Sequence, residues 1–283
     1  MKDLMRDNNE VVSKKLKIFY IGIIAICVIA IIVAIVLQVQ KSDNESEISK
    51  LPVIEENINE YQEEFDNMFE NKVNYLENNS YKIDKIKQNE DVIYLGYQVQ
   101  EKKLNSYELD VNIPYININN SVAEEFNKQI VEVFERKAKS VLNSTTGDVI
   151  YSVKYCAYVS NNILSLVIRS TLKEGTNPQR DIVQTYNYDL INQKEYTVDE
   201  ILEAKGITKR EANQKIQEEI QKVQANVEEL EKLGYTIYSR NPEDDMYSIN
   251  NVTEYFLGKD NAFYIIYAYG NQNLTDEMDI VVM

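Results

Sequence analysis

An uncharged run of twenty residues near the N-terminus constrains this chain more than any other feature. The run extends from Ile18 to Leu37 and reads IFYIGIIAICVIAIIVAIVL. With a rise of about 1.5 Å per residue, a helix of this length can cross a hydrocarbon core of about 30 Å. The apolar region of a cleaved signal peptide is shorter, at roughly 7–15 residues, and a small-x-small site follows it. No such site follows Leu37, so we expect an uncleaved transmembrane helix over residues 18–38.

The charges on either side of this run predict its direction. Lys14, Lys15 and Lys17 precede it, whereas residues 41–47 are polar and include three acidic residues and one lysine. Positive charge accumulates on the cytoplasmic side of membrane helices, which places residues 1–17 in the cytoplasm. We therefore expect a single-pass protein of the cell membrane, with a short cytoplasmic arm and a C-terminal domain outside the cell.

The rest of the chain is strongly acidic. The sequence has 30 Lys and Arg against 46 Asp and Glu, and residues 1–38 hold five of the basic and three of the acidic residues. This leaves 25 basic against 43 acidic residues, a net charge of −18, on residues 39–283. Because phosphate binding depends on Lys and Arg, we exclude nucleic acid as a ligand. A basic protein is compatible with this charge.

The chain contains no histidine. This absence excludes Ser-His-Asp and Cys-His catalysis and any zinc site built on imidazole. Gly-rich phosphate-binding fingerprints are also absent. Cys27 lies in the apolar run and Cys156 far from it, so we expect no disulfide and interpret Cys156 as a packed thiol. We accordingly expect no enzyme activity, no cofactor and no metal site.

Residues 39–90 are expected to form a linker and a stalk helix. Apolar residues recur there at alternating spacings of four and three, at Ile54, Ile58, Tyr61, Phe65 and Met68. This spacing is typical of a helix with one apolar stripe, which we extend to Leu76. Two interpretations are open: the stripe packs on its own domain, or it forms a dimeric coiled coil.

Residues 91–175 are predicted to form a first module. β-branched and aromatic residues indicate strands over 92–100 and 109–118. Ser121-Val-Ala-Glu124 resembles a capping box, which opens a helix that reaches about Leu142. Alternating residues from Val149 to Val159, an Asn-Asn turn and a return to Leu172 predict a hairpin.

Residues 176–283 are predicted to form a second module. Capping boxes at Thr197 and Thr208 start a short helix that Gly206 ends and a long helix that Gly234 closes. Strands are predicted over 182–190, 252–257, 262–269 and 278–283. The expected fold class is α+β: mostly antiparallel sheets packed with one long helix each, after a transmembrane helix and a helical stalk.

The order of several short segments resembles a bacterial arrangement of domains. The segments are Ile113-Pro114, Glu125-Phe-Asn127, Ile163-Leu-Ser-Leu-Val-Ile168, Tyr186–Leu190 and Tyr196–Leu202. This order is similar to that of the tandem domain-of-unknown-function modules of Gram-positive bacteria, a deacetylase-associated module followed by a C-terminal module. Such modules form the exterior part of lysozyme-sensing anti-sigma-V factors and precede the catalytic domain of some peptidoglycan deacetylases. The resemblance covers residues 92–283.

The resemblance implies a binding module for lysozyme or cell-wall glycan. The chain departs from the family pattern over Lys173–Arg180, where members carry a Gly/His-bearing motif. It also lacks the metal-binding histidines of the deacetylase domain, and residues 1–17 are short for a segment that holds a sigma factor. The resemblance therefore implies the binding module without the enzyme and without a direct anti-sigma role.

Four residues near the end of the chain are the candidate ligand-binding residues: Tyr264, Tyr267, Tyr269 and Asn271. Their rings and amide suit stacking on a sugar or recognition of a protein. Alternatively, the tyrosines occupy both faces of a sheet because they favour strands, and the chain has 21 of them. Acidic clusters at 243–245 and 276–279 lack EF-hand spacing, so we expect no calcium site.

These observations predict a membrane-anchored, non-catalytic binding or sensor domain at the cell envelope. Its expected ligand is a basic protein such as lysozyme, or cell-wall glycan. The alternative is a structural or assembly protein that dimerises through the stalk and docks another envelope protein. A hydrolase that uses paired carboxylates is a third hypothesis, because 46 acidic residues supply many pairs, although no pair stands out.

Overall fold

The computed structural model describes residues 60–77, 81–143 and 147–283, all of which lie in one unit, Ile58–Met283. The expected cytoplasmic arm and the apolar run at 18–38 lie outside the described residues. Within the described part of the chain, no helix is both long and apolar enough to cross a membrane.

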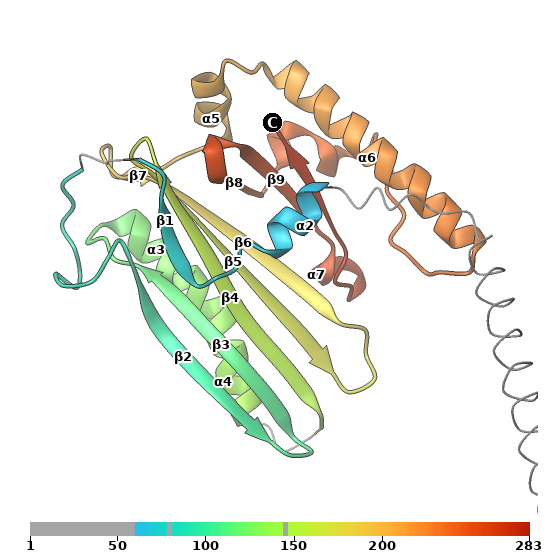
Figure 1. Cartoon of the computed structure of the whole chain (residues 1–283), viewed down its shortest axis with the longest axis horizontal. Helices are drawn as coiled ribbons and strands as arrows, with labels where there is room; N and C mark the ends of the chain where they lie inside the picture. Colours follow the sequence, from blue (N-terminus) through green and yellow to red (C-terminus); the bar gives the residue numbers. More distant parts are fainter. Residues whose placement is uncertain (1–59, 78–80, 144–146) are drawn as a thin grey trace, which may run out of the picture. The chain divides into compact units, whose positions relative to one another are not determined.

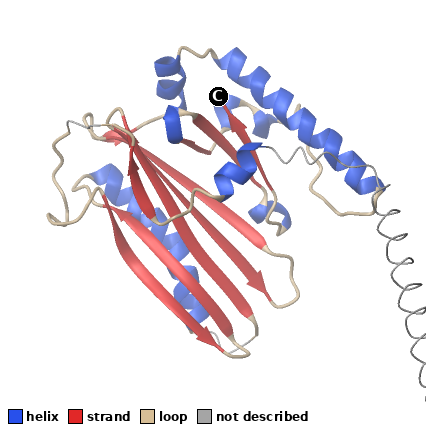
Figure 2. Cartoon of the chain, viewed as in Figure 1, coloured by secondary structure: helices blue, strands red, loops and turns tan. Residues whose placement is uncertain are grey.

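A seven-stranded sheet, here called the large sheet, forms the first part of this unit (Figures 1 and 2). Its strands run in the order β2-β3-β4-β5-β6-β7, and β1 pairs with β4. β3 pairs in parallel with the first half of β4 and β1 with the second half, while the other pairs are antiparallel. The strands are β1 (Lys72–Tyr75), β2 (Ile93–Lys103), β3 (Tyr107–Ile116), β4 (Val149–Ser160), β5 (Ile163–Glu174), β6 (Arg180–Asp189) and β7 (Lys194–Glu195).

One nearly continuous helical segment covers one face of the large sheet. It consists of α3 (Ser121–Ile130), a π-helical turn η1 (Val131–Glu135) and α4 (Arg136–Leu142). Phe126, Ile130 and Phe134 of this segment are buried in the core that it shares with the large sheet. The expected capping box at Ser121 is wrong by one residue, because Asn120 is the N-cap and its side chain accepts from the backbone N–H of Val122 at 2.8 Å.

The predicted hairpin of β4 and β5 is confirmed. Asn161 and Asn162 form its turn with φ values of 48° and 62°. Asn tolerates this left-handed conformation better than most residues, and two such residues suit the tight turn of a twisted hairpin. The half of each strand that lies next to the turn is buried on both faces. The helical segment covers one of these faces, and the chain's C-terminal part covers the other.

A three-stranded antiparallel sheet, here called the small sheet, is formed by the C-terminal part of the chain. Its order is β10-β9-β8, with β8 at Glu254–Leu257, β9 at Phe263–Ala268 and β10 at Met278–Val282. Residues alternate along β9 between two cores. Phe263, Ile265 and Tyr267 pack with the helices α5 and α6, and Tyr264 and Ile266 pack with residues of the large sheet.

Both predicted capping boxes of the second module are confirmed. Thr197 caps α5 (Val198–Lys205) and Thr208 caps α6 (Lys209–Lys232). In each, the glutamate three residues on donates its backbone N–H to the threonine side chain, and its carboxylate accepts from the threonine backbone N–H. Gly206 ends α5 in the left-handed conformation, at a φ of 66°. The short elements of this part are η2 (Asp245–Tyr247), η3 (Ile249–Asn251), η4 (Lys259–Asn261) and α7 (Gly270–Asn273).

The expected stalk helix is wrong over its second half. α2 ends at Asp66 (Glu60–Asp66), and Lys72–Tyr75 is strand β1 at the edge of β4. Phe65 and Met68 are buried with residues of the two sheets, so this part of the stripe packs on its own domain. The earlier positions of the stripe, Ile54 and Ile58, lie outside the described residues.

The structure is α+β with mostly antiparallel sheets, as predicted. The expected module boundary between residues 175 and 176 does not separate the sheets, because β6 and β7 pair within the large sheet. The change from the large to the small sheet therefore falls after Glu195. β6 lies against β8 and β9, so this strand connects the two sheets.

Candidate functional site

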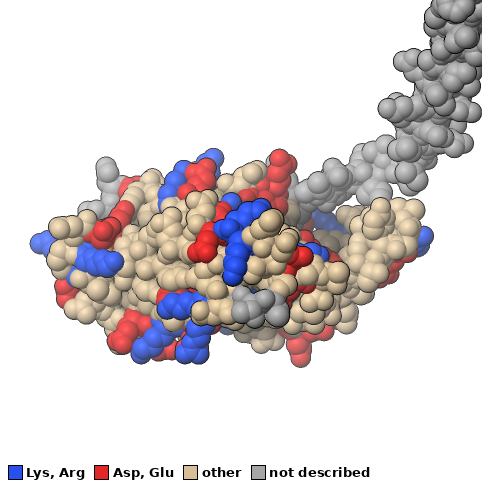
Figure 3. All heavy atoms as spheres, turned by 90° about the horizontal axis from the view of Figure 1, so that it is seen from below, with Lys and Arg blue, Asp and Glu red and all other residues tan. Residues whose placement is uncertain are grey.

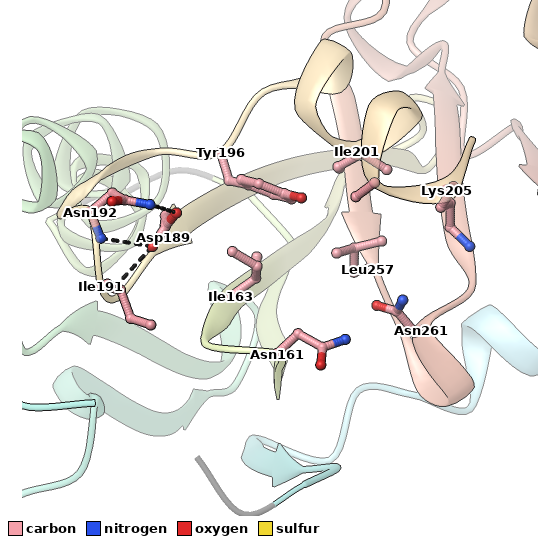
Figure 4. Close-up of a pocket in the computed structure, with 11 residues that line it drawn as sticks. Asn161, Ile163, Asp189, Ile191, Asn192, Tyr196, Ile201, Lys205, Leu257 and Asn261 are labelled. Atoms are coloured by element: carbon pink, nitrogen blue, oxygen red, sulfur yellow. Dashed lines mark hydrogen bonds between the residues drawn. The ribbon is translucent and has the colours of Figure 1, made fainter. Parts of the chain in front are cut away.

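A cavity of about 380 Å³ lies where β4 and β6 reach the end of the large sheet (Figure 4). We call it the end cavity. The β4–β5 turn, the β6–β7 turn, α5 and the segment from β8 to η4 surround it. Its volume is within the range of small-molecule sites, and ligand sites combine apolar walls with a few polar groups.

The floor of the end cavity is apolar. Ile163, Ile201 and Leu257 line it from β5, α5 and β8, and all three are buried in the core that α5 and α6 share with the small sheet. Tyr196 adds a half-buried ring above this floor, and its hydroxyl donates to the backbone carbonyl of Glu200 at 3.3 Å. The ring is therefore held in place by α5.

Two asparagine amides face each other across the end cavity. Asn161 comes from the β4–β5 turn and Asn261 from the end of η4, and their side chains point toward one another (Figure 4). Both residues have positive φ, at 48° and 58°. The Oδ1 atom of Asn261 is buried and has no hydrogen-bond partner within the described residues. The turn conformations thus explain why Asn stands at both positions, and the orphaned oxygen marks an unfilled acceptor.

The two charged groups of the end cavity differ in their surroundings. Asp189 accepts from the backbone N–H of Ile191 at 2.9 Å and from the backbone and side chain of Asn192 at 2.8 and 2.6 Å. Its carboxylate therefore shapes the β6–β7 turn. Lys205 stands in the last turn of α5, where its ammonium forms no hydrogen bond or ion pair with the described residues. Lys205 is thus a charged group free to meet a ligand.

A second cavity of about 330 Å³ lies between β6, β8, β9 and α7. We call it the carboxyl cavity, because Asp181 and Glu254 both line it. The Oε2 atom of Glu254 accepts from the backbone N–H of Thr185 at 2.7 Å and from its hydroxyl at 3.2 Å. Burial raises the pKa of the Glu254 carboxyl to about 8, although the bonds from Thr185 act in the opposite direction.

Asp181 is the less exposed of the two residues. It is 1% exposed, and its Oδ2 accepts from the Nε of Arg169 at 2.7 Å. Arg169 also pairs with Asp66 at the end of α2. Burial raises the pKa of Asp181 above its ordinary value, because the guanidinium of Arg169 offsets only part of the desolvation.

The expected aromatic surface is not formed. Tyr264, Tyr267 and Tyr269 are 2%, 6% and 0% exposed, because the small sheet is covered on both faces. Tyr264 stacks on Phe256 with ring centroids 4.6 Å apart. The three rings are core residues, so they offer no platform to a ligand at the surface.

The structure brings two of the four predicted residues together. Tyr267 and Asn271 both line the carboxyl cavity, whereas Tyr264 and Tyr269 do not. Sequence reasoning missed Glu254 and Asp181, since nothing distinguishes them from the other acidic residues of the chain. The sequence indicates a turn at both Asn161 and Asn261. Because the two residues are far apart along the chain, the sequence does not show that they lie at the same cavity.

Tyr269 belongs to a buried polar network. Its hydroxyl donates to Asp279 Oδ2 at 2.5 Å and lies 2.9 Å from the hydroxyl of Tyr247. Arg240 binds Asp279 through two nitrogens, each at 3.0 Å, and Glu277 at 2.9 Å. This network fastens the segment after α6 to β10.

The other predicted chemical groups are placed as follows. Cys156 is buried, and burial raises the pKa of its thiol. No group of three or more Asp, Glu or Cys within the described residues is arranged to hold a metal ion. In the acidic cluster at 276–279, Asp279 is engaged by Arg240 instead.

Comparison with known proteins gives limited similarity. No family model matches the chain, and no curated protein matches it. Among solved structures, a DUF3298 family protein from Pseudomonas aeruginosa is similar at 9% identity and a TM-score of 0.38. A DUF3298 family member from Bacteroides fragilis is similar at 12% identity and a TM-score of 0.32. Each alignment covers 72% of this chain and 90% of the other, and similarity at this level assigns neither a family nor a function.

Proposed function

We propose that this chain is a membrane-anchored, non-catalytic binding or sensor domain of the cell envelope, and that the end cavity receives its ligand. The observation that carries this proposal is the meeting of unfilled polar groups over an apolar floor. Asn261 Oδ1 and the Lys205 ammonium have no partner among the described residues, and Tyr196 contributes a ring to the same cavity. Convergent polar groups of this kind fix the orientation of a ligand.

The groups of the end cavity suit a cell-wall glycan. Neutral amides such as those of Asn161 and Asn261 both donate and accept, which matches the hydroxyl and acetamido groups of such a polymer. The ring of Tyr196 offers an apolar face to a sugar ring. The single cation, Lys205, suits a carboxylate on the glycan.

A basic protein such as lysozyme is the competing ligand, and the net charge of −18 on residues 39–283 favours it. On the face seen from below, basic and acidic side chains are interspersed rather than gathered into one patch (Figure 3). Charge alone therefore gives weak and salt-sensitive attraction at this face, whereas a specific complex persists in salt.

The membrane anchor and the absence of catalysis rest on the sequence. Residues 18–38 have the length and composition of a spanning helix. The chain has no histidine to serve as a general base, and its described cysteine is buried. The alternative of a stalk dimer is disfavoured, because Phe65 and Met68 are used within the domain's own core.

The deciding experiment measures binding of the full chain, purified in detergent micelles, to peptidoglycan and to hen lysozyme at low and raised salt. Asn161→Gly and Asn261→Gly remove the amides and keep a residue that tolerates positive φ. Asn105→Gly is the matched control, because Asn105 has a φ of 57° in the remote β2–β3 turn.

We expect peptidoglycan binding that resists salt and falls at least tenfold in the two cavity variants but not in Asn105→Gly. Salt-resistant binding of lysozyme alone would replace the glycan by a basic protein. Binding of neither ligand would overturn the proposal. Protease added to intact cells is expected to degrade the C-terminal domain, and full protection of that domain would contradict the proposed orientation.

A further inference from the structure

One border of the large sheet is a long strand with a free edge. β2 (Ile93–Lys103) pairs with β3 along one side and is the last strand in the order of the sheet (Figure 1). No other strand of the described residues pairs with its second side. An edge strand presents a row of unpaired backbone N–H and C=O groups, so this side of β2 is open to a further strand.

The other strand edges among the described residues are shorter or engaged. β1, β7 and β10 have four, two and five residues. The free side of β8 forms hydrogen bonds with polar side chains of the large sheet, among them Asn187 and Thr185. β2 differs from these strands because it offers eleven residues in one edge.

The sequence of β2 favours pairing with another strand. Nine consecutive residues, Val92 to Gln100, carry no charge and include no proline, and five of the nine are β-branched or aromatic. Proteins protect exposed edges with proline, charges or bulges. β2 has one bulge, at Gly96, beyond which Tyr97–Lys103 stay in unbroken register with β3. Charged residues are confined to the two ends of this edge.

These end charges have opposite signs. Glu90-Asp91 precede the uncharged run, and Lys102-Lys103 follow it. Glu101, which lies between, accepts a hydrogen bond from the Tyr107 hydroxyl of its own hairpin. In an antiparallel pair, the beginning of one strand lies beside the end of the other. Two copies of β2 that pair in this way therefore bring the acidic end of each copy to the basic end of the other.

The edge also carries groups that have no use within the domain. Glu90 and Lys103 are exposed, and their side chains form no hydrogen bond or ion pair with the described residues. Leu95 and Leu104 are 41% and 84% exposed, although both are large apolar residues. A second strand along this edge would pair the free charges and cover apolar surface.

We propose that two copies of this chain associate through their β2 strands, which pair antiparallel and join the two large sheets into one. The contact is isologous, because the same strand is used on both sides, so it closes as a dimer and leaves no free β2 edge for a third copy. It involves neither the end cavity nor the expected stalk helix. The proposal therefore does not depend on the function proposed above.

Sedimentation velocity of the full chain in density-matched detergent micelles tests the association. Two single strands form a small interface, so we expect a dimer with a Kd on the order of 10 µM. Hydrogen exchange locates the contact, because the amides of residues 93–103 are expected to exchange more slowly in the dimer. A monomer at about 100 µM would overturn the proposal and leave the edge to an extended segment of another protein. A dimer without protection of β2 would overturn it too, since the contact would then lie elsewhere in the chain.

Gln98→Lys and Gln98→Glu are the main variants. Gln98 is exposed and is the middle residue of Ile93–Lys103, so in the dimer it lies near the two-fold axis. Each variant alone brings like charges together and is expected to raise the dimer Kd by roughly tenfold. An equimolar mixture of the two is expected to associate again. Failure of the mixture to associate would contradict the pairing of two β2 strands.

Asn112→Lys is the matched control. Asn112 is the partner of Gln98 on β3, one strand away from the edge, and the two side chains are joined by a hydrogen bond of 3.0 Å. This variant breaks the same bond and adds the same charge away from the edge, so its dimer Kd is expected to match that of the unaltered chain. An equal loss in Asn112→Lys and Gln98→Lys would remove the edge as the explanation.

Charge reversal at the two ends tests the antiparallel direction. Glu90→Lys and Lys103→Glu are each expected to weaken the dimer several-fold, because each places like charges at both ends of the paired strands. The double variant is expected to associate like the unaltered chain, since both contacts form again with their signs exchanged. A double variant weaker than either single variant would contradict antiparallel pairing of β2.

Discussion

The side-chain amide of Asn187, on the large sheet, donates to the backbone carbonyl of Tyr255, on the small sheet, at 2.7 Å. Ser165 donates to Asn187 at 2.6 Å and accepts from the backbone N–H of Leu257 at 3.1 Å. Thr185 accepts from the backbone N–H of Tyr255 at 2.9 Å. Polar side chains on the face of the large sheet thus form hydrogen bonds with the backbone groups at the free edge of β8. In an isolated small sheet these backbone groups would have no partner.

Asn187→Ala is expected to lower the free energy of unfolding by about 1–3 kcal/mol, because it leaves the buried carbonyl of Tyr255 without a donor. Urea unfolding followed by tyrosine fluorescence measures this change, since the chain has 21 Tyr and no Trp. Asn177→Ala, at an exposed loop position, is the control and is expected to have little effect. Equal stability of the two variants would show that the bond is unimportant.

Gly270 is predicted to tolerate no side chain. A Cβ atom at this position would lie 1.7 Å from the carbonyl oxygen of Asp181, so α7 and β6 would have to separate. We expect Gly270→Ala to destabilise the fold by several kcal/mol. Gly147→Ala is a useful comparison, because a Cβ there meets no atom within 4 Å although its φ is 77°. A smaller loss in Gly270→Ala than in Gly147→Ala would contradict the close approach.

Arg240→Met is predicted to be strongly destabilising. The side chain of Arg240 is 4% exposed and neutralises Asp279, whose side chain is also 4% exposed. Removing one partner of a buried ion pair costs about 3–5 kcal/mol, because the other charge is left uncompensated. Chemical denaturation checks this, with Lys222→Met as the control at below about 1 kcal/mol, because Lys222 is 68% exposed and its partner Glu219 keeps a second lysine, Lys215. Adding Asp279→Leu should recover part of the loss, and no recovery would argue against the pair as its cause.

Phe65→Ala is predicted to destabilise the domain rather than to dissociate a dimer. Phe65 is fully buried, and its ring lies 5.0 Å from Phe69 and 6.1 Å from Phe256 between centroids. Truncation of a buried Phe costs about 3–5 kcal/mol. Thermal unfolding and sedimentation of the same sample separate the two effects. A lower oligomeric state with unchanged unfolding would restore the stalk-dimer hypothesis.

Elements with local signals could be predicted from the sequence. The hairpin of β4 and β5 follows from alternating residues and an Asn-Asn turn, and α5 and α6 follow from capping boxes at Thr197 and Thr208. In each case the chemistry that starts or ends the element lies within a few residues of it.

Features that depend on distant partners could not be predicted. Lys72–Tyr75 became a strand because the edge of β4 beyond β3 was free to pair with it. Tyr264 and Tyr267 point to opposite faces of β9, and both are buried because the large sheet covers one face and α6 helps to cover the other. The raised pKa of Glu254 arises from burial, which depends on the packing of β8 against the large sheet, where its carboxyl meets Thr185, 69 residues away along the chain.

Glu254 is also predicted to make stability fall as the pH rises. Its pKa is about 8 in the folded chain and about 4.3 in an exposed glutamate, so between these values the folded state binds a proton that the unfolded state has lost. The free energy of unfolding therefore decreases with pH across this window, and the full penalty is present above pH 8. Asp181, whose pKa is also raised, acts in the same direction.

Comparison of Glu254→Gln with the unaltered chain isolates this effect, because Asp181 is common to both. The variant should gain stability relative to the unaltered chain between pH 5 and pH 9, by on the order of 3 kcal/mol. Urea unfolding at several pH values measures the difference, with Glu228→Gln on the exposed side of α6 as the control. A stability difference that is constant with pH would mean that Glu254 is ionised throughout, and that the cavity around it admits enough water to solvate the charge.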